Sequence, residues 1–112
     1  YSLGVRDLTT SPSTKLAGEK VGVGKKKVDI AELHAPFAHQ ELILREALGL
    51  DASVVVNPSG GALAANAIMA AGLLRFIEAA SRIHSGEANR AVVHATSGAC
   101  LQQNMVAVLE GE

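Results

Sequence analysis

Cys100, the single cysteine of the chain, and His34 are the two side chains best suited to chemistry. A cysteine thiolate is a nucleophile or can take up a proton, and an imidazole acts as a base or donates a hydrogen bond to a developing oxyanion. Both also have a structural interpretation, since lone cysteines are often buried small hydrophobes and a histidine at the start of a helix can bond to nearby backbone. Because the two residues are far apart in the sequence, only the fold can bring them together.

A second motif, the turn Asn57-Pro58-Ser59-Gly60-Gly61, precedes a predicted helix. Its backbone amides could bind an anion, because glycine lets backbone and ligand approach closely. The glycine spacing matches neither the dinucleotide-binding fingerprint nor the phosphate-binding P-loop, so a tight turn with close helix packing is the alternative. No metal site is predicted, since one cysteine excludes a multi-cysteine zinc site and no ligand pair occurs at helical spacing.

The composition predicts one globular domain with one core. The chain has 112 residues, of which 48% are hydrophobic and 19% charged, and a net charge of −1. This balance lacks the basic excess typical of proteins that bind nucleic acid, and no apolar run reaches the length of about 18 residues that a membrane span needs. A single cysteine fits a reducing compartment, so we expect a cytoplasmic location.

Hydrophobic periodicity, together with glycine and proline positions, predicts alternating strands and helices. Residues 1–5 resemble the middle of a strand, so we expect the chain to be a piece of a longer protein. Residues 52–56 are almost wholly apolar and β-branched, which predicts a central strand covered on both faces. The other predicted elements are a helix at 11–20, a strand at 28–33, a helix at 36–48, one helix at 62–84 or two joined near Gly72, and an antiparallel hairpin of strands at 90–96 and 105–109.

Strands that alternate with helices run parallel and are joined by right-handed crossovers. The chain segments that begin at His34 and Asn57, and the loop 97–104, would then all leave from the carboxyl edge of one sheet. Open α/β sheets bind ligands at that edge. The sequence therefore predicts an α/β fold that gathers His34, Asn57 and Cys100 in one crevice.

Three ordered motifs resemble the C-terminal half of a thiolase. They are His34-Ala35-Pro36-Phe37-Ala38, Asn57-Pro58-Ser59-Gly60-Gly61-Ala62 and Ser97-Gly98-Ala99-Cys100. The likeness is closest to thiolase-like proteins of the acetyl-CoA acetyltransferase and lipid-transfer-protein types. It implies that residues 1–112 are one thiolase-like C-terminal domain without its N-terminal half. It also implies a layered α/β/α fold with a mixed, largely parallel sheet of five-stranded type and a C-terminal antiparallel hairpin.

The resemblance also implies roles for individual residues. Cys100 occupies the place of the second thiolase cysteine, which moves a proton at the α-carbon of the substrate, and His34 occupies the place of the residue that holds a water in an oxyanion hole. The turn at Ser59, Gly60 and Gly61 would lie near the thioester of coenzyme A. Asn66 stands where thiolases usually carry a histidine, and an amide cannot take up a thiol proton.

The substrate implied by the resemblance is a coenzyme A thioester, with no resident cofactor. The first functional hypothesis is an acyl-CoA C-acyltransferase of lipid metabolism that is inactive without its N-terminal thiolase half. The alternatives are a thiolase-fold lyase that performs retro-aldol cleavage on a steroid- or acyl-CoA, and a non-catalytic lipid- or acyl-CoA-binding module. Expected partners are a further copy of the chain in a homo-oligomer and a small accessory subunit. The glycine-rich stretch that usually follows the second cysteine is replaced by Leu101-Gln102-Gln103-Asn104, so the acyl pocket is expected to differ.

Overall fold

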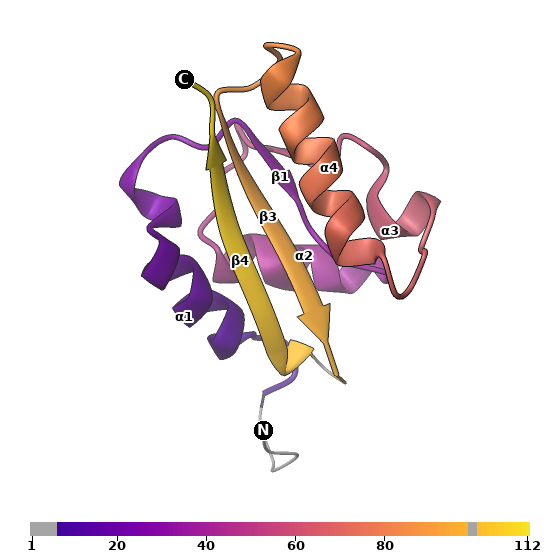
Figure 1. Cartoon of the computed structure of the whole chain (residues 1–112). Coiled ribbons are helices and arrows are strands. Elements are labelled where there is room, and N and C mark those ends of the chain that lie inside the picture. The colour runs from indigo at the N-terminus through magenta and orange to yellow at the C-terminus, as the bar shows by residue number, and fades with distance from the viewer. Residues whose placement is uncertain (1–6, 99–100) are drawn as a thin grey trace.

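Helices and strands alternate along the chain in the computed structural model, which describes residues 7–98 and 101–112. The elements, in chain order, are α1 (Pro12–Val21), the short 3-10 helix η1 (Val23–Lys25), β1 (Ile30–Glu32), α2 (Ala38–Ala47), β2 (Val55–Val56), α3 (Gly61–Ala64), α4 (Ala71–His84), β3 (Arg90–Ser97) and β4 (Gln103–Glu110) (Figure 1). Pro12 begins α1, because its fixed φ suits the first helical turn. Gly22 ends α1 in the left-handed conformation, with φ of 72°.

The strands form a mixed sheet with the order β2-β1-β3-β4. β1 pairs in parallel with both β2 and β3, whereas β3 and β4 form an antiparallel pair. This topology confirms the predicted α/β class, the largely parallel sheet and the C-terminal hairpin. The described residues contain four strands rather than five, and the strand expected at residues 1–5 lies outside them.

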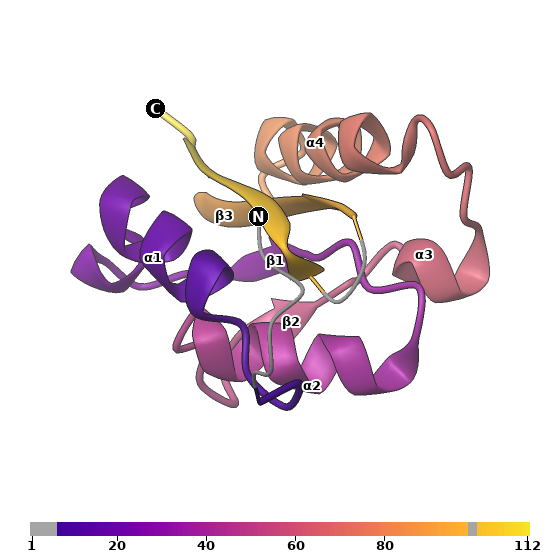
Figure 2. The same cartoon turned by 90° about the horizontal axis from the view of Figure 1, so that it is seen from below.

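Two helical layers enclose the sheet, with α4 on one face and α1 and α2 on the other (Figure 2). Side chains of a strand alternate between the two faces. Ala31 and Val92 accordingly join a core with Leu44 of α2, while Ala91 and Val93 join a second core with Ala79 of α4. The predicted α/β/α layering is confirmed.

The prediction of a central strand at 52–56 is wrong. β2 contains only Val55 and Val56, forms the edge of the described sheet, and leaves Val55 54% exposed. The central strands are β1, whose three residues are all buried, and β3. An apolar β-branched run indicates that a strand will be covered, but it does not show whether the same domain provides the cover.

The long apolar segment after the turn forms two helices, which is one of the two predicted arrangements. The break falls at residues 65–70 and not near Gly72, which lies inside α4. Gly72 packs closely on β3, because a Cβ atom built at this position would be 2.9 Å from the Cβ of Ala95. None of the described helices is long and apolar enough to cross a membrane.

Candidate functional site

His34 follows β1 at the carboxyl edge of the sheet, and its backbone is held by two neighbouring segments. The N–H of Leu33 donates to Oδ1 of Asn57 at 2.7 Å, and the N–H of His34 donates to Nδ1 of His94 at 3.3 Å. Since β1 runs parallel to β2 and β3, His34 and Asn57 leave from one edge, as predicted. Asn57 has a left-handed φ of 50°, a conformation that asparagine tolerates well.

The turn after β2 is fixed by a buried carboxylate on β1. Glu32 is fully buried, and its two oxygens accept hydrogen bonds from the N–H of Ser59 at 3.1 Å and from its hydroxyl at 2.8 Å. The N–H of Gly60 donates to the carbonyl of Asn57, and that of Gly61 to Oγ of Ser59. The amides at Ser59, Gly60 and Gly61 thus all donate within the protein. This arrangement favours the tight turn over the anion-binding turn, which stays a prediction.

Glu32 also lies beside a buried arginine of α4. Nε of Arg75, on α4, lies 3.6 Å from Oε2 of Glu32, and both side chains are almost fully buried. Burial and, to a smaller extent, the charge of Arg75 lower the pKa of His34. A hydrogen bond with the backbone of Thr96 raises this pKa, but by less. His34 is therefore neutral near pH 7, with one ring nitrogen able to donate and the other able to accept.

The imidazole of His34 keeps unused hydrogen-bonding capacity. Its Nδ1 is buried and has no partner among the residues that the structure describes. Nε and Nη1 of Arg75 are likewise buried there without a hydrogen bond, although Nε lies near the carboxylate of Glu32. A buried polar atom without a partner is unusual in a folded protein. The bond with the backbone of Thr96 uses the one N–H of the neutral ring, so the free Nδ1 is an acceptor that is suited to hold a water.

Cys100 lies outside the described residues, between Gly98 and Leu101 in the chain. Leu101 itself is buried and has a left-handed φ of 54°. Its carbonyl accepts hydrogen bonds from Nδ2 of Asn104 at 2.6 Å and from Oγ of Ser13, on α1, at 3.1 Å. The backbone that follows Cys100 is therefore held by polar contacts with two elements.

His94 and Asn104 are two further polar residues near this edge for which the sequence analysis predicted no role. Oδ1 of Asn104 lies 2.8 Å from Nε2 of His94, which is fully buried in β3. Burial lowers the pKa of His94 to about 4, even though its bond with Asn104 acts the other way. A histidine between Val93 and Ala95, in the apolar middle of a predicted strand, was the available signal, because a buried imidazole needs partners.

Asn66, which the sequence analysis gave as a candidate site residue, is exposed. It lies in the segment 65–70 between α3 and α4, and within the described ranges it has no hydrogen bond to His34. Its suggested role at the place of a thiolase histidine stays a prediction. Ile68 and Met69, in the same segment, are also largely exposed.

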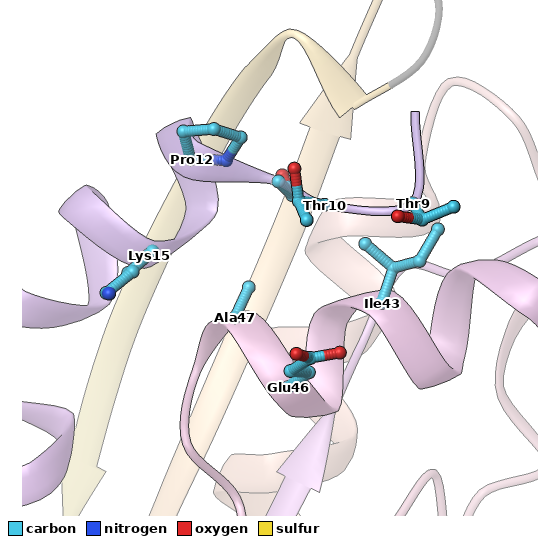
Figure 3. A pocket seen from close by; sticks show the side chains of 8 residues that line it. Thr9, Thr10, Pro12, Lys15, Ile43, Glu46 and Ala47 are labelled. Atoms are coloured by element: carbon cyan, nitrogen blue, oxygen red, sulfur yellow. The ribbon is translucent and has the colours of Figure 1, made fainter. Parts of the chain in front are cut away.

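A cavity of about 420 Å³ opens between the start of α1 and α2 (Figure 3). It is lined by Thr9, Thr10, Ser11, Pro12, Lys15, Ile43, Glu46 and Ala47. None of the predicted site residues lines this cavity, so we do not assign the chemistry to it. Residues 7–98 and 101–112 contain no group of three or more His, Cys, Asp or Glu side chains that could hold a metal ion.

Comparison with known proteins gives one match. A family model described as "Thiolase, C-terminal domain" matches residues 5–109, which is nearly the whole chain. No curated protein and no solved structure matches.

Proposed function

This chain belongs to the thiolase family as a C-terminal domain, and from that premise we propose that it forms part of the active site of an acyl-CoA C-acyltransferase. The reaction would be the Claisen condensation of acyl-CoA thioesters or its reverse, thiolysis. The substrate is a coenzyme A thioester, and the mechanism needs no resident cofactor. The family supports the acyl-transfer class, and the site supports the individual roles below.

The placement of His34 is the observation that carries the proposal. Its backbone is held at the carboxyl edge of the sheet, its ring is neutral, and its buried Nδ1 has no partner within the described part of the chain. A ring in this state can orient a water toward a developing oxyanion, which is the role that the family likeness gives it. Pre-oriented donors of this kind are commonly worth a factor of about 10²–10³ in rate.

Cys100 supplies the proton transfer in this proposal. Its thiolate takes a proton from the α-carbon of acetyl-CoA, so that a C–H bond breaks, an S–H bond forms and the negative charge moves onto the thioester oxygen. The water held by His34 donates to that oxygen. The enolate carbon then attacks the carbonyl carbon of an acyl group held as a thioester on a cysteine of the N-terminal thiolase half. A C–C bond forms, the acyl C–S bond breaks, and the thiolate of that cysteine leaves.

Exposed apolar side chains support the need for this N-terminal half. They gather on α3, on α4 and between these helices: Leu63, Ile68, Met69, Leu73 and Ile77. An apolar surface of this kind is typical of an interaction site. We propose that the N-terminal half and further copies of the chain cover it, with a small accessory subunit as a further partner. The chain alone would have no turnover, and the assembled enzyme would be cytoplasmic.

Asn66 favours a second candidate function. A thiolase that lacks the histidine at this place cannot activate its nucleophilic cysteine in the usual way, since an amide cannot accept a thiol proton. A retro-aldol lyase on a steroid- or acyl-CoA needs an oxyanion site and proton transfer but no acyl-enzyme. The site around His34 would serve that reaction as well.

Replacing Cys100 in the protein that carries this chain tests the proposal. We expect Cys100→Ala to lower acetoacetyl-CoA cleavage at least about 100-fold, because general acid–base catalysis contributes a factor of about 10²–10⁴. Ser85→Ala is the control, since Ser85 directly follows the C-terminal end of α4 and the change removes two side-chain hydrogen bonds there. Unchanged activity in Cys100→Ala would rule out the proton-transfer role. Retro-aldol cleavage of a β-hydroxyacyl-CoA without thiolysis would select the lyase.

A further inference from the structure

His94 lies at the centre of a chain of hydrogen bonds that crosses three elements. The residue is fully buried in β3, and its two ring nitrogens face different partners. Nδ1 lies 3.3 Å from the backbone nitrogen of His34, and Nε2 lies 2.8 Å from Oδ1 of Asn104. Both nitrogens are thus bonded inside the protein.

The partners of His94 determine its tautomer. A backbone N–H can only donate, so Nδ1 of His94 must accept the bond from His34. The proton of a neutral ring is then on Nε2, which donates to the amide oxygen of Asn104. The low pKa of His94, which burial causes, keeps the ring in this neutral form near pH 7.

Asn104 extends the chain of bonds to the loop that follows β3. Its amide nitrogen donates to Oγ of Ser13 at 2.7 Å and to the carbonyl of Leu101 at 2.6 Å. The hydroxyl of Ser13 in turn donates to the same carbonyl. An asparagine side chain offers one acceptor and two donors, and all three are used here. An aspartate could accept from His94 but could not donate to Leu101.

Leu101 needs such support because of its backbone conformation. Its φ of 54° is in the left-handed region, which is unfavourable for a residue other than glycine. The two hydrogen bonds to its carbonyl and the burial of its side chain offset that cost. The stretch from Leu101 to Asn104, where the sequence departs from the glycine-rich pattern of the family, thus contains its own anchor.

We propose that His94 and Asn104 are positioning residues that hold the backbone of His34 and the backbone of Leu101 at a fixed separation. Both ends of the chain of bonds are backbone groups. One is the N–H of His34, and the other is the carbonyl of Leu101, the residue that directly follows Cys100 in the sequence. The catalytic consequence rests on the proposed function, whereas the coupling of the two backbone segments does not.

Two substitutions cut the chain of bonds at opposite ends. His94→Gln keeps a donor toward Asn104, because the amide nitrogen of glutamine can replace Nε2, but it removes the acceptor for His34. Asn104→Asp keeps the acceptor for His94 and removes the donors to Leu101 and Ser13. Ser13→Ala is the mild third variant, because the bond from Asn104 to Leu101 remains. Ser85→Ala is again the control at the far end of the molecule.

Nuclear magnetic resonance of the isotope-labelled chain tests the geometry without any assay of activity. We expect the backbone amide proton of His34 to shift and to exchange faster in His94→Gln, and to shift by a smaller amount in Asn104→Asp. The carbonyl carbon of Leu101 should shift most in Asn104→Asp and by a smaller amount in His94→Gln, because the chain of bonds links the two backbone segments. Spectra in which neither signal changes, or in which each variant changes only the signal at its own end, would overturn the proposal.

Steady-state kinetics of the protein that carries this chain tests the consequence. We expect kcat to fall roughly ten- to a hundredfold in both variants, because a misplacement of about 1 Å can cost a factor of about 10². KM should change less than about twofold. The kcat of Ser13→Ala should fall less than that of either variant. A kcat that stays at the value of Ser85→Ala in both would overturn the positioning role. A parent protein with no thioester activity would refute the proposed function alone, since the spectra decide the coupling independently.

Discussion

Glu32, Arg90 and His94 are buried side chains whose polar groups each bond to more than one segment of the chain. Glu32 holds the turn at Ser59 and pairs with Arg75 of α4. Arg90 pairs with Glu110 and donates to the carbonyls of Gly22, Val23 and Lys26. His94 joins the backbone of His34 to Asn104. A buried polar group is costly without partners, so each of these residues selects one arrangement of its neighbours.

The low pKa of His94 predicts a pH dependence of stability. The pKa is about 4 in the folded chain against 6.5 as the ordinary value, so the unfolded chain binds the proton first as the pH falls. The free energy of unfolding should therefore drop between about pH 6.5 and pH 4, by roughly 3 kcal/mol for this residue. The pKa of His34 is lowered too and acts in the same direction.

Urea denaturation of the chain at several pH values measures this effect. His94→Gln provides the comparison, because it removes the titrating ring and leaves His34 and the carboxylates in place. The variant should lose clearly less stability than the unsubstituted chain between pH 6.5 and pH 4.5. Equal slopes in the two proteins would show that His94 is not held neutral by folding.

At the scale of elements, close packing between α4 and β3 decides where the second helix begins. The sequence pattern of residues 62–84 predicts either one helix or two helices joined near Gly72. A glycine inside a helix costs about 1 kcal/mol of stability relative to alanine, which favours a break there. In the structure Gly72 instead brings α4 close to Ala95, and the break lies in the exposed segment before Ala71. Packing against the sheet outweighs the local preference.

Gly72→Ala tests this explanation, because its local and tertiary effects oppose each other. We expect the substitution to destabilise the chain by about 1–2 kcal/mol, since overpacking costs about 1–3 kcal/mol and helix propensity returns up to about 1 kcal/mol. Gly24→Ala is the matched control, because in the described part of the chain no atom beyond its two sequence neighbours lies within 4 Å of the added Cβ. Its free energy of unfolding should change by less than about 0.5 kcal/mol. Thermal or urea unfolding measures both. A stabilised Gly72→Ala would contradict the close contact.

At the scale of the whole molecule, the outer side of α4 is unusually apolar for a surface. Leu73 and Ile77 are four residues apart on this helix and are 64% and 53% exposed, and Met69 just before the helix is 98% exposed. β2 also forms an edge of the described sheet with an exposed valine. The exposed apolar side of α4 and the open edge at β2 support the proposal that other protein covers them.

Lysines on this face should weaken association of the chain with itself. We expect the double variant Leu73→Lys and Ile77→Lys to sediment as a smaller species than the unsubstituted chain at equal concentration. Its unfolding free energy should change by less than about 0.5 kcal/mol per site, because exposed helix positions tolerate lysine. Sedimentation velocity measures the first effect and urea denaturation the second.

Ala52→Lys with Ser85→Lys adds the same charge at exposed positions away from this face. This control should associate as the unsubstituted chain does. Equal association in all three proteins would show that the outer face of α4 is not the contact surface.

The sequence alone determined the α/β class, the terminal hairpin and the common edge of His34 and Asn57. These features follow from local periodicity and from the handedness of crossovers, which depend on residues close together in the chain. The two helical layers were implied by the resemblance to thiolases. The edge position of β2, the start of α4 at Ala71 and the contacts of His94 with His34 and Asn104 came from the tertiary structure alone. Each of these depends on which distant side chain fills the space beside a residue, and sequence spacing carries no such information.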